Sequence, residues 1–199
     1  MIPTISFLFG LAVGSFLNVC IHRLPRGESV VAPRSHCPSC QRLIAAYDNI
    51  PLVSYLLLGG KCRYCKVRIS PQYFFVELAT GLLFLLLYYL FDWSLLFAKQ
   101  AIFGSLLIVL TVTDWRERLL PDLVNFPGMA LGLLFSVVLP IGDGTGLWLA
   151  RVAGLGGLPL FVPSLLDALL GALAGGGFLY LLGEAYFRLR HREGMGLGD

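Results

Sequence analysis

Apolar residues are gathered into five long stretches along this chain, and polar segments between them carry nearly all of its charge. The stretches cover residues 2–21, 73–91, 95–113, 123–141 and 160–183. Each is close to the length of about 20 residues that a helix needs to cross the hydrocarbon layer of a bilayer. Inside lipid the backbone must satisfy its own hydrogen bonds, so each stretch is predicted to be helical. The pattern therefore predicts an all-α polytopic membrane protein with about five transmembrane helices.

The first stretch has an alternative interpretation as a secretory signal peptide. No Lys or Arg precedes Arg23, and no Ala-x-Ala-like cleavage site follows the apolar run. Signal peptides normally have both features. A first transmembrane helix over residues 1–21 is therefore the favoured interpretation.

The composition agrees with helices that face lipid. Hydrophobic residues make up 57% of the chain, charged residues 14%, and the mean hydropathy is +0.78. Soluble domains usually carry about 25% charged residues. The net charge is only +3, and no basic stripe with interleaved aromatic residues is present, so we expect no nucleic-acid partner.

The basic residues predict the orientation of the helices. Thirteen of the fifteen Lys and Arg residues lie in segment 22–72, in the loop 114–122 and in the tail after residue 183. Only Lys99 and Arg151 fall on the opposite side. Because basic loops stay on the cytoplasmic side, we expect an outside N-terminus and a cytoplasmic 22–72 segment.

Small residues point to close helix packing and to one irregular loop. Gly10 and Gly14, and likewise Gly171 and Gly175, form GxxxG patterns, which we interpret as membrane packing. Residues 142–157 are rich in glycine and are expected to form an outer loop.

Four of the five cysteines occur as two CxxC pairs in the 22–72 segment. The pairs are Cys37 with Cys40 and Cys62 with Cys65, with twenty-one residues between them. Four thiolates at this spacing are typical of a structural zinc site, and a reducing cytoplasm disfavours disulfides. A four-sulfur site is closed, so the metal would stabilise the loop rather than catalyse a reaction. An iron–sulfur cluster uses the same ligands, and free thiols or a redox pair are the remaining alternatives.

Two aspartates lie at the predicted cytoplasmic ends of membrane helices. Asp114 follows the third apolar stretch, and Asp199 ends the sequence Gly194-Met-Gly196-Leu-Gly198-Asp199. Two facing carboxylates can share one proton, so that one activates water while the other polarises a carbonyl. Glycines before Asp199 would allow close backbone approach.

In its ordered set of motifs the chain resembles the type IV prepilin peptidases, membrane aspartic proteases with a GxGD motif. The likeness runs through Gly14-Ser-Phe-Leu-Asn-Val19, Arg23-Leu-Pro25, both cysteine pairs, Asn49-Ile-Pro51, Ile69-Ser-Pro71, Glu77, Asp114, Leu120-Pro121-Asp122 and Gly196-Leu-Gly198-Asp199. It covers essentially the whole chain.

The resemblance implies a catalytic pair, Asp114 and Asp199, that cleaves the basic leader of type IV prepilins or type II secretion pseudopilins on the cytoplasmic side of the bacterial inner membrane. Many members also methylate the new N-terminus with S-adenosylmethionine. Gly196, Gly198 and Asp122 would support the motif. Glu77 could accept the basic leader of the substrate or could serve as an interfacial anchor.

The expected domains are the first helix, a cytoplasmic zinc-binding loop domain over 22–72 and a membrane aspartic peptidase domain over 73–199. The family pattern continues past GxGD with further helices, so the last domain is expected to be incomplete at its C-terminal end. Two alternatives stay open: a catalytically inactive zinc-loop membrane assembly factor, and a methyltransferase that lacks peptidase activity.

Overall fold

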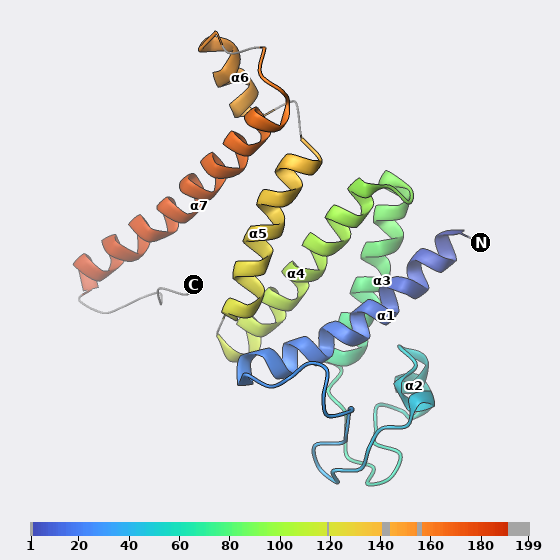
Figure 1. Cartoon of the computed structure of the whole chain (residues 1–199). Helices are drawn as coiled ribbons and strands as arrows, with labels where there is room; N and C mark the ends of the chain where they lie inside the picture. Colours follow the sequence, from blue (N-terminus) through green and yellow to red (C-terminus); the bar gives the residue numbers. More distant parts are fainter. Residues whose placement is uncertain (1, 119, 141–143, 155–156, 191–199) are drawn as a thin grey trace. The chain divides into compact units, whose positions relative to one another are not determined.

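The computed structural model describes residues 2–118, 120–140, 144–154 and 157–190, and it divides into two compact units, 1–121 and 122–199. The first unit contains α1 (Ile2–Arg23), η1 (Leu24–Arg26), η2 (Ala46–Asn49), α2 (Val53–Leu57), α3 (Gln72–Phe91) and α4 (Leu95–Glu117) (Figure 1). The second contains α5 (Asp122–Val138), α6 (Thr145–Val152) and α7 (Phe161–Arg190). The described residues contain no β-strand, so the predicted all-α fold is confirmed.

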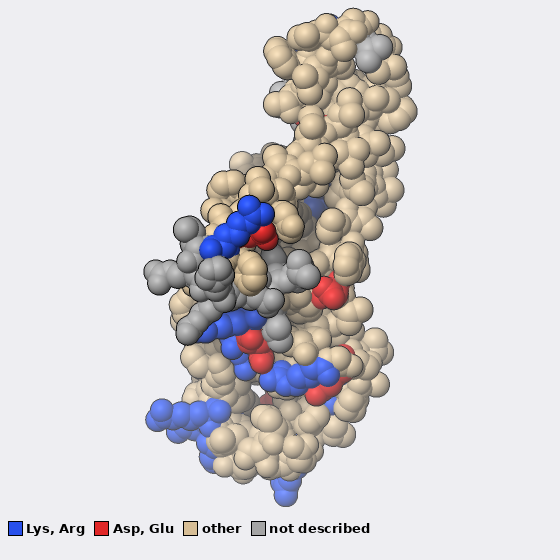
Figure 2. Space-filling model, turned by 90° about the vertical axis from the view of Figure 1, so that its left-hand side faces the viewer, with Lys and Arg blue, Asp and Glu red and all other residues tan. Residues whose placement is uncertain are grey.

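Four helices of the described chain are long and apolar enough to cross a membrane. They are Ile2–Arg26, Gln72–Phe91, Leu95–Glu117 and Phe161–Arg188. The apolar helix α5 has 17 residues and is shorter than these four. On the face that Figure 2 presents, long stretches of surface carry no charged side chain.

Helices α1 and α3 form the closest helix pair of the first unit, and glycines make their contact possible. A Cβ atom added to Gly10 would lie 2.7 Å from the Phe84 Cβ, and one added to Gly14 would lie 2.8 Å from the Glu77 Cα. From the other side, a Cβ on Gly81 would lie 2.6 Å from the Leu11 side chain. Packing explains the first GxxxG pattern, whereas a Cβ added to Gly171 or Gly175 would meet no described atom within 4 Å outside its own helix backbone.

The turn between α3 and α4 joins these helices into an antiparallel hairpin. Asp92 adopts a left-handed conformation with φ of 50°, and the Ser94 hydroxyl caps α4 by accepting a hydrogen bond from the Phe97 N–H at 3.1 Å. Behind this turn, the rings of Phe84 and Phe97 pack edge to face with centroids 5.8 Å apart. The hairpin places the start of α3 and the end of α4 on the same side of the first unit.

In the second unit, the glycine-rich segment expected to be an irregular loop contains the helix α6. The Asp167 carboxylate of α7 accepts hydrogen bonds from the Thr145 hydroxyl and the Gly146 N–H in the first turn of α6. A carboxylate at a helix start satisfies N–H groups that otherwise lack a partner. The short helix therefore depends on a contact from more than twenty residues further along the chain.

We predict that Gly14→Ala destabilises the folded protein. The new methyl group would meet the α3 backbone, and such overpacking costs about 1–3 kcal/mol. The measurement is the thermal unfolding midpoint in detergent, which should fall. Gly175→Ala is the matched control, because it brings the same gain in helix propensity at a site with open space. Equal midpoints for the two variants would contradict the close α1–α3 contact.

Candidate functional site

The first cysteine pair lies on a tight turn, which we call the first knuckle (residues 36–43). The Cys37 N–H donates to the Arg42 carbonyl at 2.9 Å, and the Gln41 N–H donates to the Cys37 carbonyl at 2.8 Å. Gln41 has a φ of 57°, a left-handed conformation that is uncommon outside glycine. A single antiparallel bridge between His36 and Leu43 closes the turn.

The second knuckle (residues 61–68) repeats this geometry twenty-five residues later. The Cys62 N–H donates to the Val67 carbonyl at 2.9 Å, and the Lys66 N–H donates to the Cys62 carbonyl at 3.1 Å. Lys66 has a φ of 59°, and Lys61 and Arg68 form the closing bridge. Each knuckle therefore presents its two sulfurs through the same backbone conformation.

The two knuckles together bring the four cysteine sulfurs within 4.8 Å of one another. The sulfurs of Cys37 and Cys65, one from each knuckle, lie 3.8 Å apart. Four sulfurs at the zinc–sulfur bond length of about 2.3 Å in a tetrahedron lie about 3.8 Å apart. The cluster could therefore hold a metal ion such as zinc with little contraction.

The pKa values of two thiols in the cluster are shifted in opposite directions. The backbone N–H groups of Cys65 and Tyr64 lower the pKa of the Cys62 thiol to about 6. At Cys40 the Arg42 N–H lowers the pKa, but desolvation and the other three sulfurs outweigh it and raise the pKa to about 11. A metal binds thiolates, so the lowered pKa of Cys62 offers one ligand that ionises near neutral pH, well below the pH at which Cys40 ionises.

Arginine side chains join each knuckle to other parts of the cysteine loop. The Arg63 guanidinium donates to both Asp48 oxygens, with Nε–O distances of 2.8 and 3.0 Å, and lies 5.3 Å from the centre of the Tyr47 ring. The paired guanidinium lowers the pKa of Asp48. Arg42 of the first knuckle lies 4.9 Å from the ring centre of Tyr64 in the second. Cation–π contacts and a bidentate ion pair thus join parts of the loop that are distant in sequence.

Three polar side chains of α1 and α3 attach the cysteine loop to the helices. The buried Arg23 donates to the Ser29 and Pro33 carbonyls at 2.8 and 2.7 Å. Asn18 of α1 donates to the Tyr73 carbonyl in the first turn of α3 at 3.1 Å. Hydrogen bonds therefore fix the chain both where the loop follows α1 and where it joins α3.

Glu77 provides the third attachment. Its side chain lies in α3, is 8% exposed, and accepts a hydrogen bond from the Leu52 N–H at 2.8 Å. Leu52 has a φ of 59° and immediately precedes α2. Glu77 thus anchors the loop to α3, while contact with a substrate leader stays a prediction.

Asp114 lies in the last turn of α4, at the same end of the α3–α4 hairpin as the start of α3, where the cysteine loop joins that helix. Its side chain is exposed, and no described residue forms a hydrogen bond or ion pair with its carboxylate. The preceding residue, Thr113, is fully buried and donates to the Val109 carbonyl at 2.8 Å. The helix therefore holds Asp114 at its surface, next to the buried Thr113.

The remaining predicted site residues belong to the second unit. Asp122 is exposed and is the first residue of α5. Gly196, Gly198 and Asp199 lie outside the described residues. The pairing of Asp114 with Asp199 therefore stays a prediction.

Two protein-family models match the chain. The one described as "Bacterial Peptidase A24 N-terminal domain" matches residues 8–91, and the one described as "Type IV leader peptidase family" matches residues 101–199. The chain belongs to the type IV leader peptidase family. The second match includes both Asp114 and Asp199.

Curated relatives agree with this assignment. Proteins from Myxococcus xanthus, Neisseria gonorrhoeae and Klebsiella pneumoniae, each named "Prepilin leader peptidase/N-methyltransferase", are 37, 38 and 39% identical over 97, 98 and 98% of this chain. The chain spans about half, 51%, of the M. xanthus relative and 69 and 79% of the other two. No solved structure matches the chain.

Sequence reasoning identified the cysteines but missed the anchoring role of Asn18 and Arg23. Both stand in motifs that supported the family resemblance, yet the structure gives them backbone carbonyls as partners. Polar residues next to a membrane span were the available signal, since a buried polar group there needs a partner.

We predict that Glu77→Ala loosens the cysteine loop. The substitution leaves the part-buried Leu52 N–H without its acceptor, and losing this hydrogen bond to a charged group costs up to about 3 kcal/mol. Limited proteolysis of the 22–72 segment in nanodiscs should become faster, with Glu77→Gln intermediate because its amide oxygen can still accept. Glu117→Ala is the control, since it removes only a partly exposed ion pair with Arg26. Unchanged proteolysis of Glu77→Ala would show that this bond does not hold the loop.

Proposed function

We propose that this chain carries the machinery of a membrane aspartic endopeptidase that removes the leader peptide of type IV prepilins or type II secretion pseudopilins. Membership of the leader peptidase family is the observation that carries the proposal, together with a matched region that contains both aspartates. The carboxylate of Asp114 is exposed at a helix end and has no partner among the described residues, which supports the proposal, because a catalytic carboxylate must be reachable by substrate.

In the proposed reaction, Asp114 and Asp199 share one proton. The ionised carboxylate takes a proton from a water molecule, whose oxygen adds to the carbonyl carbon of the scissile peptide bond. The protonated carboxyl donates a hydrogen bond to the carbonyl oxygen and stabilises its developing charge. When the C–N bond breaks, a proton passes to the leaving amine, so water is consumed and no metal is required.

The side of the membrane follows from the basic residues. The positive-inside rule supports a cytoplasmic cysteine loop, a cytoplasmic end of α4 and an outside N-terminus in the bacterial inner membrane. The membrane character of the chain rests on its four long apolar helices. Cleavage at Asp114 would therefore occur on the cytoplasmic side, where a basic leader remains during insertion of its pilin.

We also propose that the four cysteines bind one structural zinc ion and that the mature pilin is N-methylated with S-adenosylmethionine. The fit of the sulfur cluster to a tetrahedral site supports zinc, which would then stabilise the loop without an open coordination position. The printed name of the relatives supports the methyl transfer.

The aspartyl mechanism predicts that Asp114→Asn and Asp199→Asn each abolish leader cleavage. Loss of a general acid–base group lowers the rate by about 10²-fold or more. The assay is conversion of prepilin to mature pilin in membranes, with mass spectrometry of the product to reveal N-methylation. Asp92→Asn is the control, because this exposed aspartate lies at the opposite end of the α3–α4 hairpin. Normal cleavage by both test variants would exclude the mechanism, whereas methylation of pre-cut pilin without cleavage would favour the methyltransferase alternative.

The zinc proposal predicts about one equivalent of zinc per chain by elemental analysis of the purified protein. Cys62→Ser should lose most of the metal and expose the loop to proteolysis, because three thiolates no longer close the site. Cys20→Ser is the control, since this buried cysteine lies within α1, outside the cluster. Metal-free protein with four reactive thiols would refute the site, and iron with visible absorbance would favour a cluster instead.

A further inference from the structure

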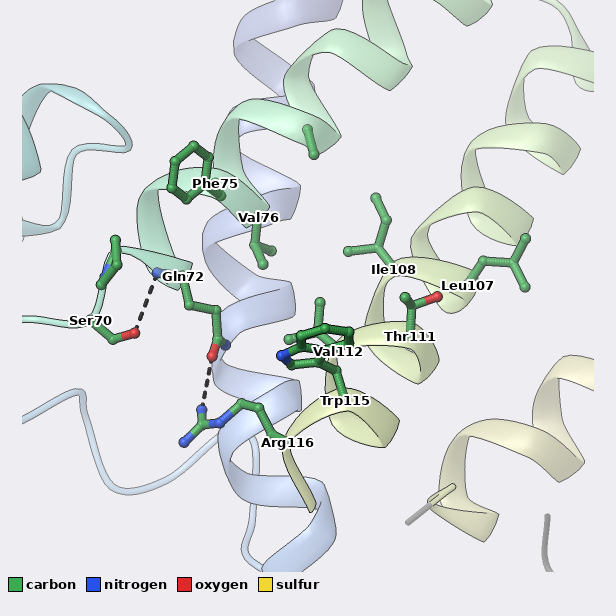
Figure 3. A pocket seen from close by; sticks show the side chains of 12 residues that line it. Ser70, Gln72, Phe75, Val76, Leu107, Ile108, Thr111, Val112, Trp115 and Arg116 are labelled. Carbon is green, nitrogen blue, oxygen red and sulfur yellow. Dashed lines mark hydrogen bonds between the residues drawn. The ribbon is translucent and has the colours of Figure 1, made fainter. Parts of the chain in front are cut away.

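The α3/α4 groove lies between the halves of these two helices that are nearest the cysteine loop. Its volume is about 750 Å³, within the range of about 300–1,000 Å³ seen for small-molecule sites. Apolar side chains form most of its wall, with Phe75, Val76 and Ala79 from α3 and Leu107, Ile108 and Val112 from α4 (Figure 3). Asp114 is not among the residues that line it.

Thr111 lies among the apolar residues of the groove, and the other hydroxyl, amide and guanidinium groups, those of Ser70, Gln72 and Arg116, gather at one end (Figure 3). Arg116 donates to the Gln72 side-chain oxygen at 3.1 Å, and the Ser70 hydroxyl accepts from the Gln72 N–H at 3.3 Å. These bonds leave the Gln72 amide nitrogen, the Ser70 hydroxyl proton and further Arg116 N–H groups available as donors. The end of the groove is thus rich in donors.

This polar end also carries uncompensated positive charge. Arg116 forms no ion pair with a described carboxylate, and none of the described residues that line the groove is acidic. The first turn of the twenty-residue helix α3 lies at the same end, with the partial positive charge of a helix N-terminus. An anionic group fits this end better than a neutral one.

The groove lies at the depth where a membrane changes from apolar to polar. Its apolar part belongs to two predicted membrane spans, and its polar part belongs to their ends. Trp115, which is 87% exposed, stands beside Arg116 at this level, and tryptophan is enriched at membrane interfaces. A ligand that fills the groove should therefore be an amphiphile with one anionic end.

We propose that the α3/α4 groove binds an anionic phospholipid. One acyl chain lies among the apolar residues, and the phosphate accepts hydrogen bonds from Arg116, Gln72 and Ser70. Basic pockets between membrane helices on the cytoplasmic side are known to bind anionic head groups. The proposal needs the chain to be in a membrane but does not depend on its peptidase activity.

Trp115 provides the probe for the test. Trp93→Phe and Trp148→Phe together leave it as the only tryptophan of three. This protein is placed in phosphatidylcholine nanodiscs with an increasing minor fraction of one brominated lipid, either phosphatidylglycerol or phosphatidylcholine. Brominated acyl chains quench tryptophan on contact. Brominated phosphatidylglycerol should quench Trp115 at a several-fold lower fraction than brominated phosphatidylcholine.

Variants separate the head-group site from the groove. Arg116→Gln should remove the preference, Arg116→Lys should keep most of it, and Arg118→Gln should leave it unchanged, because Arg118 does not line the groove. Ala79→Phe fills the groove and should also remove the preference, whereas Leu86→Phe, at an exposed site on the same helix, should not.

Three results would overturn the proposal. Equal quenching by both brominated lipids would indicate bulk lipid only. No quenching by either would indicate that protein covers the groove, either a segment of this chain or a second copy. A preference that survives Ala79→Phe would place the lipid elsewhere.

Discussion

The close approach of α1 to α3 is the constraint on which the first unit depends. Gly10, Gly14 and Gly81 leave no room for a side chain at the contact, so the two backbones meet directly. Lipid provides no hydrophobic drive for this association, which therefore rests on van der Waals packing and on hydrogen bonds between the helices, such as those from Ser6 to the Phe84 carbonyl and from Asn18 to the Tyr73 carbonyl. Both the α3–α4 hairpin and the two ends of the cysteine loop are positioned relative to this pair.

Several motif residues of the first unit stabilise this arrangement. Asn18 joins the end of α1 to the start of α3, Arg23 holds the outgoing loop, and Glu77 holds the segment around Leu52. All three are buried polar groups bonded to backbone atoms at the level where the helices leave the membrane. Such bonds are strong there because water competes poorly for them.

The sequence predicted the features that follow from local composition. Apolar runs gave the membrane helices, and the CxxC spacing gave the four-sulfur cluster. It missed α6, because this eight-residue helix depends on Asp167 far along the chain and on a glycine, Gly146, packed against the Pro163 carbonyl. It also missed the matching left-handed residues of the knuckles, since Gln41 and Lys66 carry no composition signal for that conformation.

The anchoring of both loop ends changes the entropy of ordering the cysteine loop. Residues 24–71 leave α1 and enter α3, and the Asn18–Tyr73 bond links these two helices directly. Bringing together the ends of a free chain of roughly 50 residues would cost about 3.5 kcal/mol in closure entropy. The packing of α1 against α3 in the bilayer already holds the two ends of the loop together, so it offsets this loss of entropy. Folding of the loop therefore has only to order the residues between its ends. The two knuckles meet within the small volume that a chain fixed at both ends can reach, which is smaller than the volume open to a chain with free ends.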